Sequence, residues 1–239
     1  MRDLARIFAV GLALAVGLAS PVFAEDAKPF ADAKEIDLTQ LLSPPPANDS
    51  AQMKAELGEI LTIQVTRTKA MEERAIADAE ENVWRFADVI DNPKFTKDKL
   101  PKFTAFFDRI IETEAAVVDP AKNVWKRPRP HLYSDLVKPV VPLSKSGSYP
   151  SGHTTVGTLM GIVLSNMVPE KKAAIMARAW EYGHNRVVGG IHYQTDIEAG
   201  RIAGTVIAQT IMTHPDYKTE FEAAKAELRA ELGLQAQSN

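Results

Sequence analysis

The chain has 239 residues, of which 45% are hydrophobic and none is cysteine, and its formal net charge is −3. The lack of cysteine excludes disulfide bonds and thiolate metal sites, so packing must stabilise the fold. The slightly acidic balance excludes a general attraction to nucleic acid or to an anionic membrane, and any positive charge that matters must be local.

The first residues have the pattern of a secretory signal peptide. Arg2 and Arg6 make a positive start, residues 7–18 are apolar, and Val22-Phe23-Ala24 offers small residues at the cleavage positions. The apolar run is too short for a comfortable membrane span, which makes an uncleaved anchor the weaker alternative. We expect cleavage of residues 1–24, a periplasmic location, no membrane association after cleavage, and a mature chain of 215 residues that forms one domain.

The stretch after the signal peptide is an arm followed by helix-forming sequence. Residues 25–49 are polar and include the triple proline 44–46, which favours extended backbone over a domain of its own. Residues 51–90 have no proline and one glycine, which predicts one long helix or two, with Ser50 as the cap. Four apolar residues of this stretch are expected to face inward: Leu57, Ile60, Ile63 and Val65.

The rest of the chain has helical periodicity and no alternating strand pattern. Residues 101–118 form an amphipathic pattern with an aromatic and isoleucine stripe, which is typical of a core-facing helix. Further helices are predicted over 151–182, 195–213 and 216–233, and residues 235–239 form a loose tail. The sequence therefore predicts an all-α protein with a single helical domain at residues 50–234.

A stretch rich in glycine and proline, residues 147–154, precedes one of these helices. The helix is expected to begin within or just after Ser151-Gly152-His153, and its first N–H groups would then be free to bind an anion. Gly152 permits a close approach, Ser151 adds a hydroxyl donor, and His153 can carry a proton. The alternative is an ordinary loop that leads into a core helix.

The stretch from Arg186 to Asp196 combines a cation, an imidazole and a carboxylate. Thr195 is predicted to cap a helix, with Glu198 completing a capping box. His192 would lie just before that helix, where Asp196 can accept a ring N–H and leave the other nitrogen free as a nucleophile. The alternative is a surface hydrogen bond. Two glycines one turn apart would let another helix approach closely: Gly200 and Gly204.

A third stretch supplies positive charge beside prolines. Pro130 keeps Arg129 in extended backbone, so that its guanidinium can be directed at a target, and Lys122 lies seven residues earlier. Guanidinium, ammonium and backbone donors together suit a tetrahedral oxyanion. The alternative for Lys126-Arg127 is a solvated basic turn. Two or three histidines and one aspartate fall short of a recognisable metal-ligand set, so no metal is expected.

Three ordered stretches carry a resemblance to a known family: Lys122-x6-Arg129-Pro130, Pro150-Ser151-Gly152-His153 and Arg186-x5-His192-x3-Asp196. Their pattern resembles that of the type 2 phosphatidic acid phosphatase superfamily, which includes the vanadium-dependent haloperoxidases. The string from Gly147 to Thr154, the signal peptide and the Leu-Leu-x-Pro-Pro-Pro arm are similar to those of class A bacterial nonspecific acid phosphatases. The seven-residue distance from Lys122 selects Arg129 over Arg127 as the family's arginine. The residue before Arg186, usually serine in the family, is Asn185 here, so the phosphate contact of that serine is not carried over to this chain.

The resemblance implies a helical bundle of the superfamily's kind and a role for each matching residue. His192 would be the nucleophile, Asp196 would orient it, and His153 would act as general acid and base. Four side chains and one glycine would hold the phosphate: Lys122, Arg129, Ser151, Gly152 and Arg186. Positive side chains would replace a metal, so no cofactor is expected. His131, His184 and His214 match no family position and are interpreted as structural.

The resulting hypothesis is an exported acid phosphatase of broad phosphomonoester range that acts through a phosphohistidine. Transfer of phosphate to alcohols or nucleosides is a further expectation, and assembly as a homo-oligomer, a dimer or larger, is another. A vanadium haloperoxidase is an alternative because the same residues can hold vanadate, although the mature chain is short. A non-catalytic phosphate-binding module is disfavoured by His153 and the His192–Asp196 pair, and a lipid pyrophosphate phosphatase by the lack of membrane spans.

Overall fold

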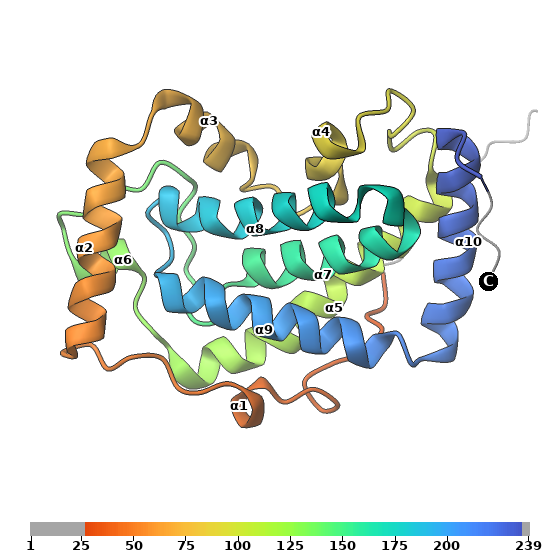
Figure 1. Ribbon diagram of the computed structural model, residues 1–239. Helices are drawn as coiled ribbons and strands as arrows, with labels where there is room; N and C mark the ends of the chain where they lie inside the picture. The colour runs from red at the N-terminus through yellow and green to blue at the C-terminus, as the bar shows by residue number, and fades with distance from the viewer. Residues whose placement is uncertain (1–26, 236–239) are drawn as a thin grey trace, which may run out of the picture.

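A computed structural model describes residues 27–235, and all regular secondary structure in that range is helical, which confirms the all-α class (Figure 1). The expected signal peptide and residues 236–239 lie outside the described range. The α-helices are α1 (Leu38–Leu41), α2 (Ala51–Thr66), α3 (Lys69–Ala77), α4 (Ala87–Ile90), α5 (Pro101–Trp125), α6 (Pro130–Tyr133), α7 (Gly152–Met167), α8 (Lys172–Val188), α9 (Gln194–Ile211) and α10 (Pro215–Leu232). Two short 3₁₀-helices are η1 (Val83–Phe86) and η2 (Pro169–Lys171).

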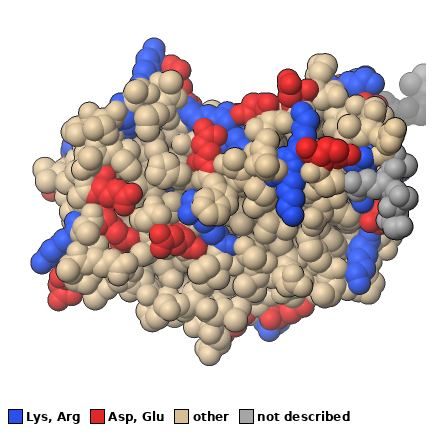
Figure 2. Space-filling model, in the orientation of Figure 1, with Lys and Arg blue, Asp and Glu red and all other residues tan. Residues whose placement is uncertain are grey.

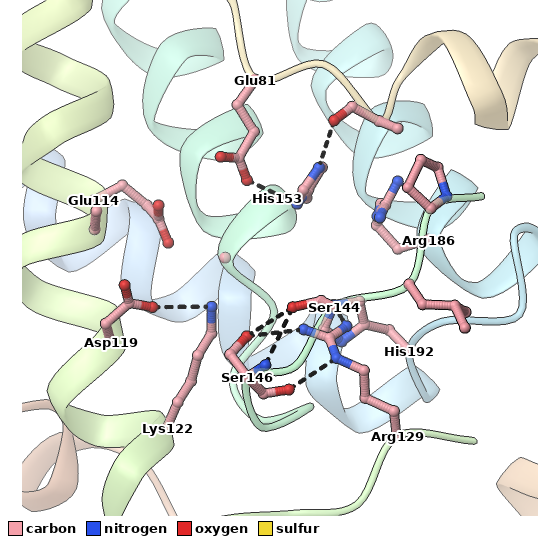
Figure 3. Close-up of a pocket in the computed structure, with 15 residues that line it drawn as sticks. Glu81, Glu114, Asp119, Lys122, Arg129, Ser144, Ser146, His153, Arg186 and His192 are labelled. Atoms are coloured by element: carbon pink, nitrogen blue, oxygen red, sulfur yellow. Dashed lines mark hydrogen bonds and ion pairs between the residues drawn. The ribbon is translucent and has the colours of Figure 1, made fainter. Parts of the chain in front are cut away.

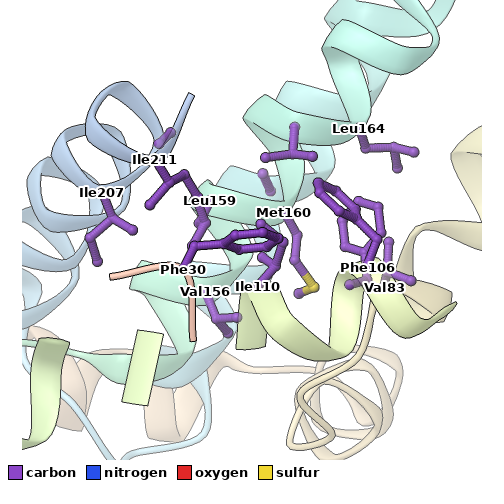
Figure 4. Close-up of a cluster of buried hydrophobic side chains, with 14 of the residues drawn as sticks. Phe30, Val83, Phe106, Ile110, Val156, Leu159, Met160, Leu164, Ile207 and Ile211 are labelled. Atoms are coloured by element: carbon purple, nitrogen blue, oxygen red, sulfur yellow. The ribbon is translucent and has the colours of Figure 1, made fainter. Parts of the chain in front are cut away.

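Helix α7 is the centre of the bundle, with α8 and α9 beside it, α5 across it and α10 at one end (Figure 1). Almost every residue of α7 is buried, as expected of a helix that is apolar on all sides. Figure 4 shows the largest apolar cluster, in which Val156, Leu159, Met160 and Leu164 of α7 meet residues of α5 and α9. The N-terminal arm adds Phe30 to this cluster, so the arm packs on the domain.

The predicted helical stretch 51–90 is divided into separate helices by capping residues. Ser50 accepts from the Met53 N–H at 3.1 Å and starts α2, and Thr68 accepts from the Met71 N–H at 3.3 Å and starts α3. Ile60 is buried, and Leu57 and Ile63 are partly buried, as predicted. The prediction for Val65 is wrong, because this residue is 79% exposed. It lies five residues after Ile60, about 140° around the helix, and so on the solvent side.

Two other predicted helices have different bounds. The periodicity over 151–182 is interrupted at Val168-Pro169, since proline lacks an N–H and its ring excludes a helical predecessor, and α8 then continues to Val188. Helix α5 extends beyond residue 118 and through Pro120, because Val117, Val118 and other residues of its apolar stripe stay buried. Lys122 therefore lies in the last turn of a helix.

Charged residues of both signs are interspersed over the face shown in Figure 2. No broad patch of one sign appears on that face, which agrees with the near-neutral composition. Within residues 27–235, no helix combines the length and hydropathy needed to cross a membrane.

The close contact between α7 and α9 depends on the two predicted glycines. A Cβ on Gly200 would lie 2.7 Å from the Ser151 carbonyl oxygen, and a Cβ on Gly204 would lie 2.5 Å from the Thr155 carbonyl oxygen. Both distances are shorter than van der Waals contact, and backbone atoms cannot rotate away as a side chain does. Glycine therefore allows α9 to hold its N-terminal turn against the start of α7.

We predict that Gly204→Ala lowers the free energy of unfolding by about 1–3 kcal/mol, because the added methyl group overpacks the α7–α9 contact. Gly58→Ala is the matched control: it lies in α2 with no atom within 4 Å of an added Cβ. There the loss of glycine's backbone freedom should raise stability by about 0.5–1 kcal/mol. Urea denaturation followed by circular dichroism measures both, and equal effects of the two substitutions would contradict the packing argument.

Candidate active site

The three predicted stretches meet at one pocket of about 340 Å³ (Figure 3). Six of the eight predicted site residues line this pocket: Lys122, Arg129, Gly152, His153, Arg186 and His192. They come from α5, the segment before α6, α7, α8 and the loop before α9. The two other predicted residues, Ser151 and Asp196, are fully buried behind the pocket wall.

His192 is buried, and each of its ring nitrogens has a different partner. Its Nδ1 lies 3.1 Å from Asp196 Oδ2, and its Nε2 lies 2.9 Å from Arg129 Nη1. Since a guanidinium can only donate, these partners assign the hydrogen to Nδ1, and the lone pair of Nε2 accepts from Arg129. Burial lowers the pKa of His192 well below its ordinary value, and the charges of Arg129, Arg186, Lys122 and His153 lower it further. The ring is therefore neutral and nucleophilic at Nε2.

Asp196 accepts hydrogen bonds from several directions. The Tyr193 N–H donates to it at 2.9 Å, Arg127 Nη1 at 2.6 Å, and the Ser148 hydroxyl also donates. Burial raises the pKa of Asp196, while Arg127, Ser148 and the Tyr193 N–H oppose that rise and favour the carboxylate. A fixed carboxylate at this position holds the His192 ring in one tautomer and one orientation.

The predicted cap of α9 is wrong by two residues. Tyr193 is the N-cap, and Asp196 occupies the third helical position, where it accepts from the Tyr193 N–H. Thr195 lies inside the first turn and accepts from Arg127, while Glu198 accepts from Gln194. The helix starts earlier because the Asp196 carboxylate, which orients His192, also accepts from the free N–H of the N-cap Tyr193.

Arg127 is a site residue that spacing alone did not identify. It is 3% exposed, donates to Glu56 at 2.7 Å as well as to Asp196, and lies over the Tyr193 ring at 4.1 Å. Of the expected solvated turn, only Lys126 is exposed. The Arg-Pro-Arg-Pro sequence thus supplies two different functions, with Arg127 neutralising a carboxylate and Arg129 facing the pocket.

The cations that face the pocket have little compensating charge. Arg129 donates to the carbonyl oxygens of Ser146 at 2.9 Å and Ile191 at 3.2 Å, and Arg186 has no hydrogen-bond partner at Nε or Nη1 within residues 27–235. Neither has a carboxylate within 4.0 Å in the described part of the chain. Burial and the charge of Arg186 lower the pKa of Arg129 to about 10, against the opposing effect of Asp196. Two buried guanidinium groups without anions create a strong preference for an anionic ligand.

His153 stands on the opposite side of the pocket from Arg129 in Figure 3, with both nitrogens near acceptors. Its Nδ1 lies 2.7 Å from Glu81 Oε1 and its Nε2 lies 3.0 Å from the Ala79 carbonyl oxygen. Both nitrogens can donate at once only when the ring is protonated. Burial opposes ionisation of Glu81, but His153, Lys122 and Arg186 outweigh it and lower the pKa of Glu81. Glu81 was not predicted, and no spacing in the sequence relates it to His153.

The start of α7 supplies the backbone part of the site. Ser151 caps the helix by accepting from the Thr154 N–H, and its hydroxyl does not line the pocket. A Cβ on Gly152 would lie 2.8 Å from Glu114 Oε1 and 2.9 Å from Lys122 Nζ, so glycine is needed for these side chains to approach. Lys122 Nζ also lies 3.3 Å from Asp119 Oδ1. Glu114 and Asp119 line the pocket but were not predicted, although both precede Lys122 within about two turns of α5.

Asn185 is directed away from the pocket. Its Nδ2 donates to Asp78 Oδ2 at 2.8 Å, and Asp78 is fully buried between Arg178 and Arg85. Asparagine at this position therefore connects α8 to the end of α3 and makes no contribution to the pocket lining.

The remaining histidines, His131, His184 and His214, do not line the pocket. His184 is exposed on α8, and His214 bonds to Glu35 and to the Phe30 carbonyl, which ties the arm to α10. Among residues 27–235, no group of three or more histidine, aspartate or glutamate side chains is arranged to hold a metal ion.

We predict that Arg127→Met lowers the free energy of unfolding by about 3–5 kcal/mol, because Asp196 and Glu56 then keep buried charges without their common partner. The neighbouring exposed residue gives the control: Lys126→Met should change stability by no more than about 0.5 kcal/mol. Urea unfolding of both variants tests this. A small effect for Arg127→Met would show that the buried carboxylates do not depend on this guanidinium.

Comparison with known proteins agrees with this geometry. Residues 110–220 match the family described as the PAP2 superfamily. A protein named non-specific acid phosphatase from Providencia stuartii is 31% identical over 212 residues, which covers 82% of each chain. A protein of the same name from Salmonella typhimurium is 29% identical over 214 residues, 86% of each chain.

A solved structure shows the same fold at lower sequence identity. The transmembrane PAP2 type phosphatidylglycerolphosphate phosphatase from Bacillus subtilis matches with a TM-score of 0.51 and 17% identity, over 70% of this chain and 87% of its own. The order of the three stretches, their convergence on one pocket and the similarity over most of the chain lead to one assignment. The protein belongs to the PAP2 superfamily.

Proposed function

We propose that this protein is an exported acid phosphatase that hydrolyses a broad range of phosphomonoesters through a phosphohistidine on His192. The observation that carries the proposal is the neutral, buried His192, whose unprotonated Nε2 lies beside two guanidinium groups that lack anions within the described range. The names of the Providencia and Salmonella relatives support the reaction class. Membership of class A is part of the proposal and rests on the sequence from Gly147 to Thr154.

The phosphoryl group would bind where the cations converge. Arg129, Arg186 and Lys122 supply fixed positive charge, and the first N–H groups of α7, at Gly152 and His153, add backbone donors at the positive end of the helix. Ser151 would act indirectly by holding that helix start, since its hydroxyl caps α7. In the free protein Arg129 donates to His192 Nε2, so the substrate must draw this guanidinium onto its own oxygens to expose the nucleophile.

The first chemical step would form a bond from His192 Nε2 to phosphorus while the bond to the leaving oxygen breaks. The Nδ1 hydrogen stays on the ring, where Asp196 stabilises the resulting positive charge. His153 would give its Nε2 proton to the leaving oxygen, which requires the ring to exchange the Ala79 carbonyl for the substrate. Glu81 would hold the other side of the ring through Nδ1.

In the second step a water molecule would attack phosphorus, His153 would take one of its protons, and the bond to His192 would break to release phosphate. An alcohol or nucleoside hydroxyl in place of water would give transfer instead of hydrolysis, and we include this activity in the proposal. Periplasmic location is proposed from residues 1–24 alone, and assembly as a homo-oligomer is proposed without a surface assigned to it.

We predict that His192→Ala reduces the turnover of nitrophenyl phosphate to less than about a hundredth, since covalent catalysis contributes several powers of ten. The same substrate should leave a phosphorylated residue 192 in rapidly quenched wild-type protein, detected by mass spectrometry. His184→Ala serves as the matched control because His184 is an exposed histidine of the neighbouring helix. Retention of the phosphorylated state in His192→Ala would assign the nucleophile elsewhere.

We predict an acidic pH range that follows from the lowered pKa of His192. An ordinary histidine, with a pKa of about 6.5, would be mostly protonated and inactive below that pH. Burial and the surrounding cations favour the neutral ring, so kcat/KM should remain high below pH 6.5 and fall only at the lowered pKa. Chelator should leave the rate unchanged, and vanadate should inhibit competitively. An alkaline optimum with loss of activity in chelator would point to a metal-dependent phosphatase.

A further inference from the structure

Glu114 is a buried carboxyl in the pocket for which the proposed reaction has no use. It lies on α5, eight residues before Lys122, and is 5% exposed. Its Oε1 is buried and has no hydrogen-bond partner within residues 27–235. The same oxygen is the atom nearest to where a Cβ of Gly152 would be, so it lies at the start of α7 where the anion is expected. In Figure 3 this side chain extends from α5 toward that helix start.

The groups around Glu114 do not compensate a negative charge there. Lys122 and Asp119 belong to the same helix, Glu81 comes from the segment before η1, and His153 and Arg186 come from α7 and α8. No lysine, arginine or histidine in the described range lies within 4.0 Å of the Glu114 carboxyl. Burial raises the pKa of Glu114 to about 8, Glu81 and Asp119 add to the rise, and Lys122 opposes it.

The two protonation states of this carboxyl would have opposite effects on a bound phosphate. An ionised carboxylate has only acceptors and repels phosphate oxygens, whereas a neutral carboxyl has one O–H donor. A hydrogen bond from a neutral donor to a charged oxygen is among the stronger ones in proteins. In its neutral form, this buried carboxyl, which has no partner at Oε1 within residues 27–235, can donate to an acceptor that enters the pocket.

We propose that Glu114 binds in its neutral form and donates a hydrogen bond to the phosphoryl group, as a substrate-binding residue beside Lys122 and Gly152. This inference rests on the proposed phosphatase site and deepens it, because it adds a proton-dependent contact to the fixed cations. Loss of the Glu114 proton would remove the donor and place a negative charge next to the phosphate. Phosphate binding would then require the protein to take up one proton at alkaline pH.

The probe is inorganic phosphate, titrated calorimetrically into the full mature protein between about pH 6 and pH 9. Wild type, Glu114→Gln and Glu112→Gln are compared, each in two buffers of different ionisation enthalpy, so that proton uptake is measured directly. Glutamine keeps a donor of similar shape but cannot ionise. Glu112 is the matched control because it is an exposed glutamate of the same helix, two residues away.

We expect the ratio of the wild-type Kd to the Glu114→Gln Kd to rise about fivefold between pH 8 and pH 9, because with a pKa of about 8 the protonated form that binds falls from about a half to about a tenth of the protein. Near pH 9 wild type should take up about one proton more than Glu114→Gln on binding, and Glu112→Gln should match wild type. The protonation state of phosphate also changes over this pH range, but it changes equally for both proteins and so cancels in the ratio of their Kd values.

A constant ratio across this range, or equal proton uptake in the two proteins, would overturn the proposal. If Glu114→Gln fails to fold, the wild-type protein still decides: infrared difference spectra on phosphate binding at pH 7 should perturb the C=O stretch of a protonated carboxyl. The absence of such a band would overturn the proposal.

The proposed function can fail separately. Wild type that binds phosphate with the predicted proton uptake but hydrolyses no phosphomonoester would reject the catalytic assignment and retain the Glu114 contact. Wild-type protein that hydrolyses phosphomonoesters but takes up no more protons than Glu114→Gln on binding phosphate would reject the Glu114 contact and retain the catalytic assignment. If phosphate does not bind at all, both proposals are wrong.

Discussion

Asp196 has no exposed surface, and separate parts of the chain meet at its carboxylate. Arg127 reaches it from the segment after α5, Ser148 from the loop before α7, and the Tyr193 N–H and His192 from the start of α9. A buried carboxylate is unfavourable unless such donors surround it, so the bundle must close around this group in one arrangement. The orientation of His192 follows from that arrangement. Glu56 extends the network to α2 by binding both Arg127 and the Thr195 N–H.

The distribution of buried charge separates structural arginines from those that face the ligand. Arg127 and Arg178 are matched by buried carboxylates, Asp196 and Asp78, and they hold the bundle together. Arg129 and Arg186 are also buried, but within residues 27–235 Arg129 donates to carbonyl groups and Arg186 has no partner at Nε or Nη1. Burying these two guanidinium groups costs free energy that no carboxylate of the described residues offsets, and a bound anion would offset it. The same four arginines at the same positions would form an inert core if each had its own carboxylate.

Two acidic side chains of the pocket, Glu81 and Glu114, have pKa values that their surroundings shift in opposite directions. Glu81 lies against His153, and against the effect of burial His153, Lys122 and Arg186 lower its pKa, while burial raises the pKa of Glu114, which has no cation within 4.0 Å among the described residues. Two carboxyls in one pocket thus have opposite charge states for different physical reasons. In the proposed reaction, Glu81 would support the proton donor to the leaving group, and Glu114 would present a proton to the phosphate. The α7–α9 contact at Gly200 and Gly204 holds the start of α7, which carries His153, close against α9.

The sequence by itself determined the helical class, the start of α7 at Ser151-Gly152 and the pairing of His192 with Asp196, because each depends on local spacing along the chain. The family pattern distinguished Arg129 from Arg127 by its distance from Lys122, and the structure places only Arg129 in the pocket. The roles of Arg127, Glu81 and Glu114 were decided only by the tertiary structure. The groups that Arg127 and Glu81 bind, and the helix start that Glu114 approaches, lie up to 72 residues away, and no local rule relates them. The exposure of Val65 and the direction of Asn185 toward Asp78 have the same cause, since burial is a property of the packed bundle and not of the segment.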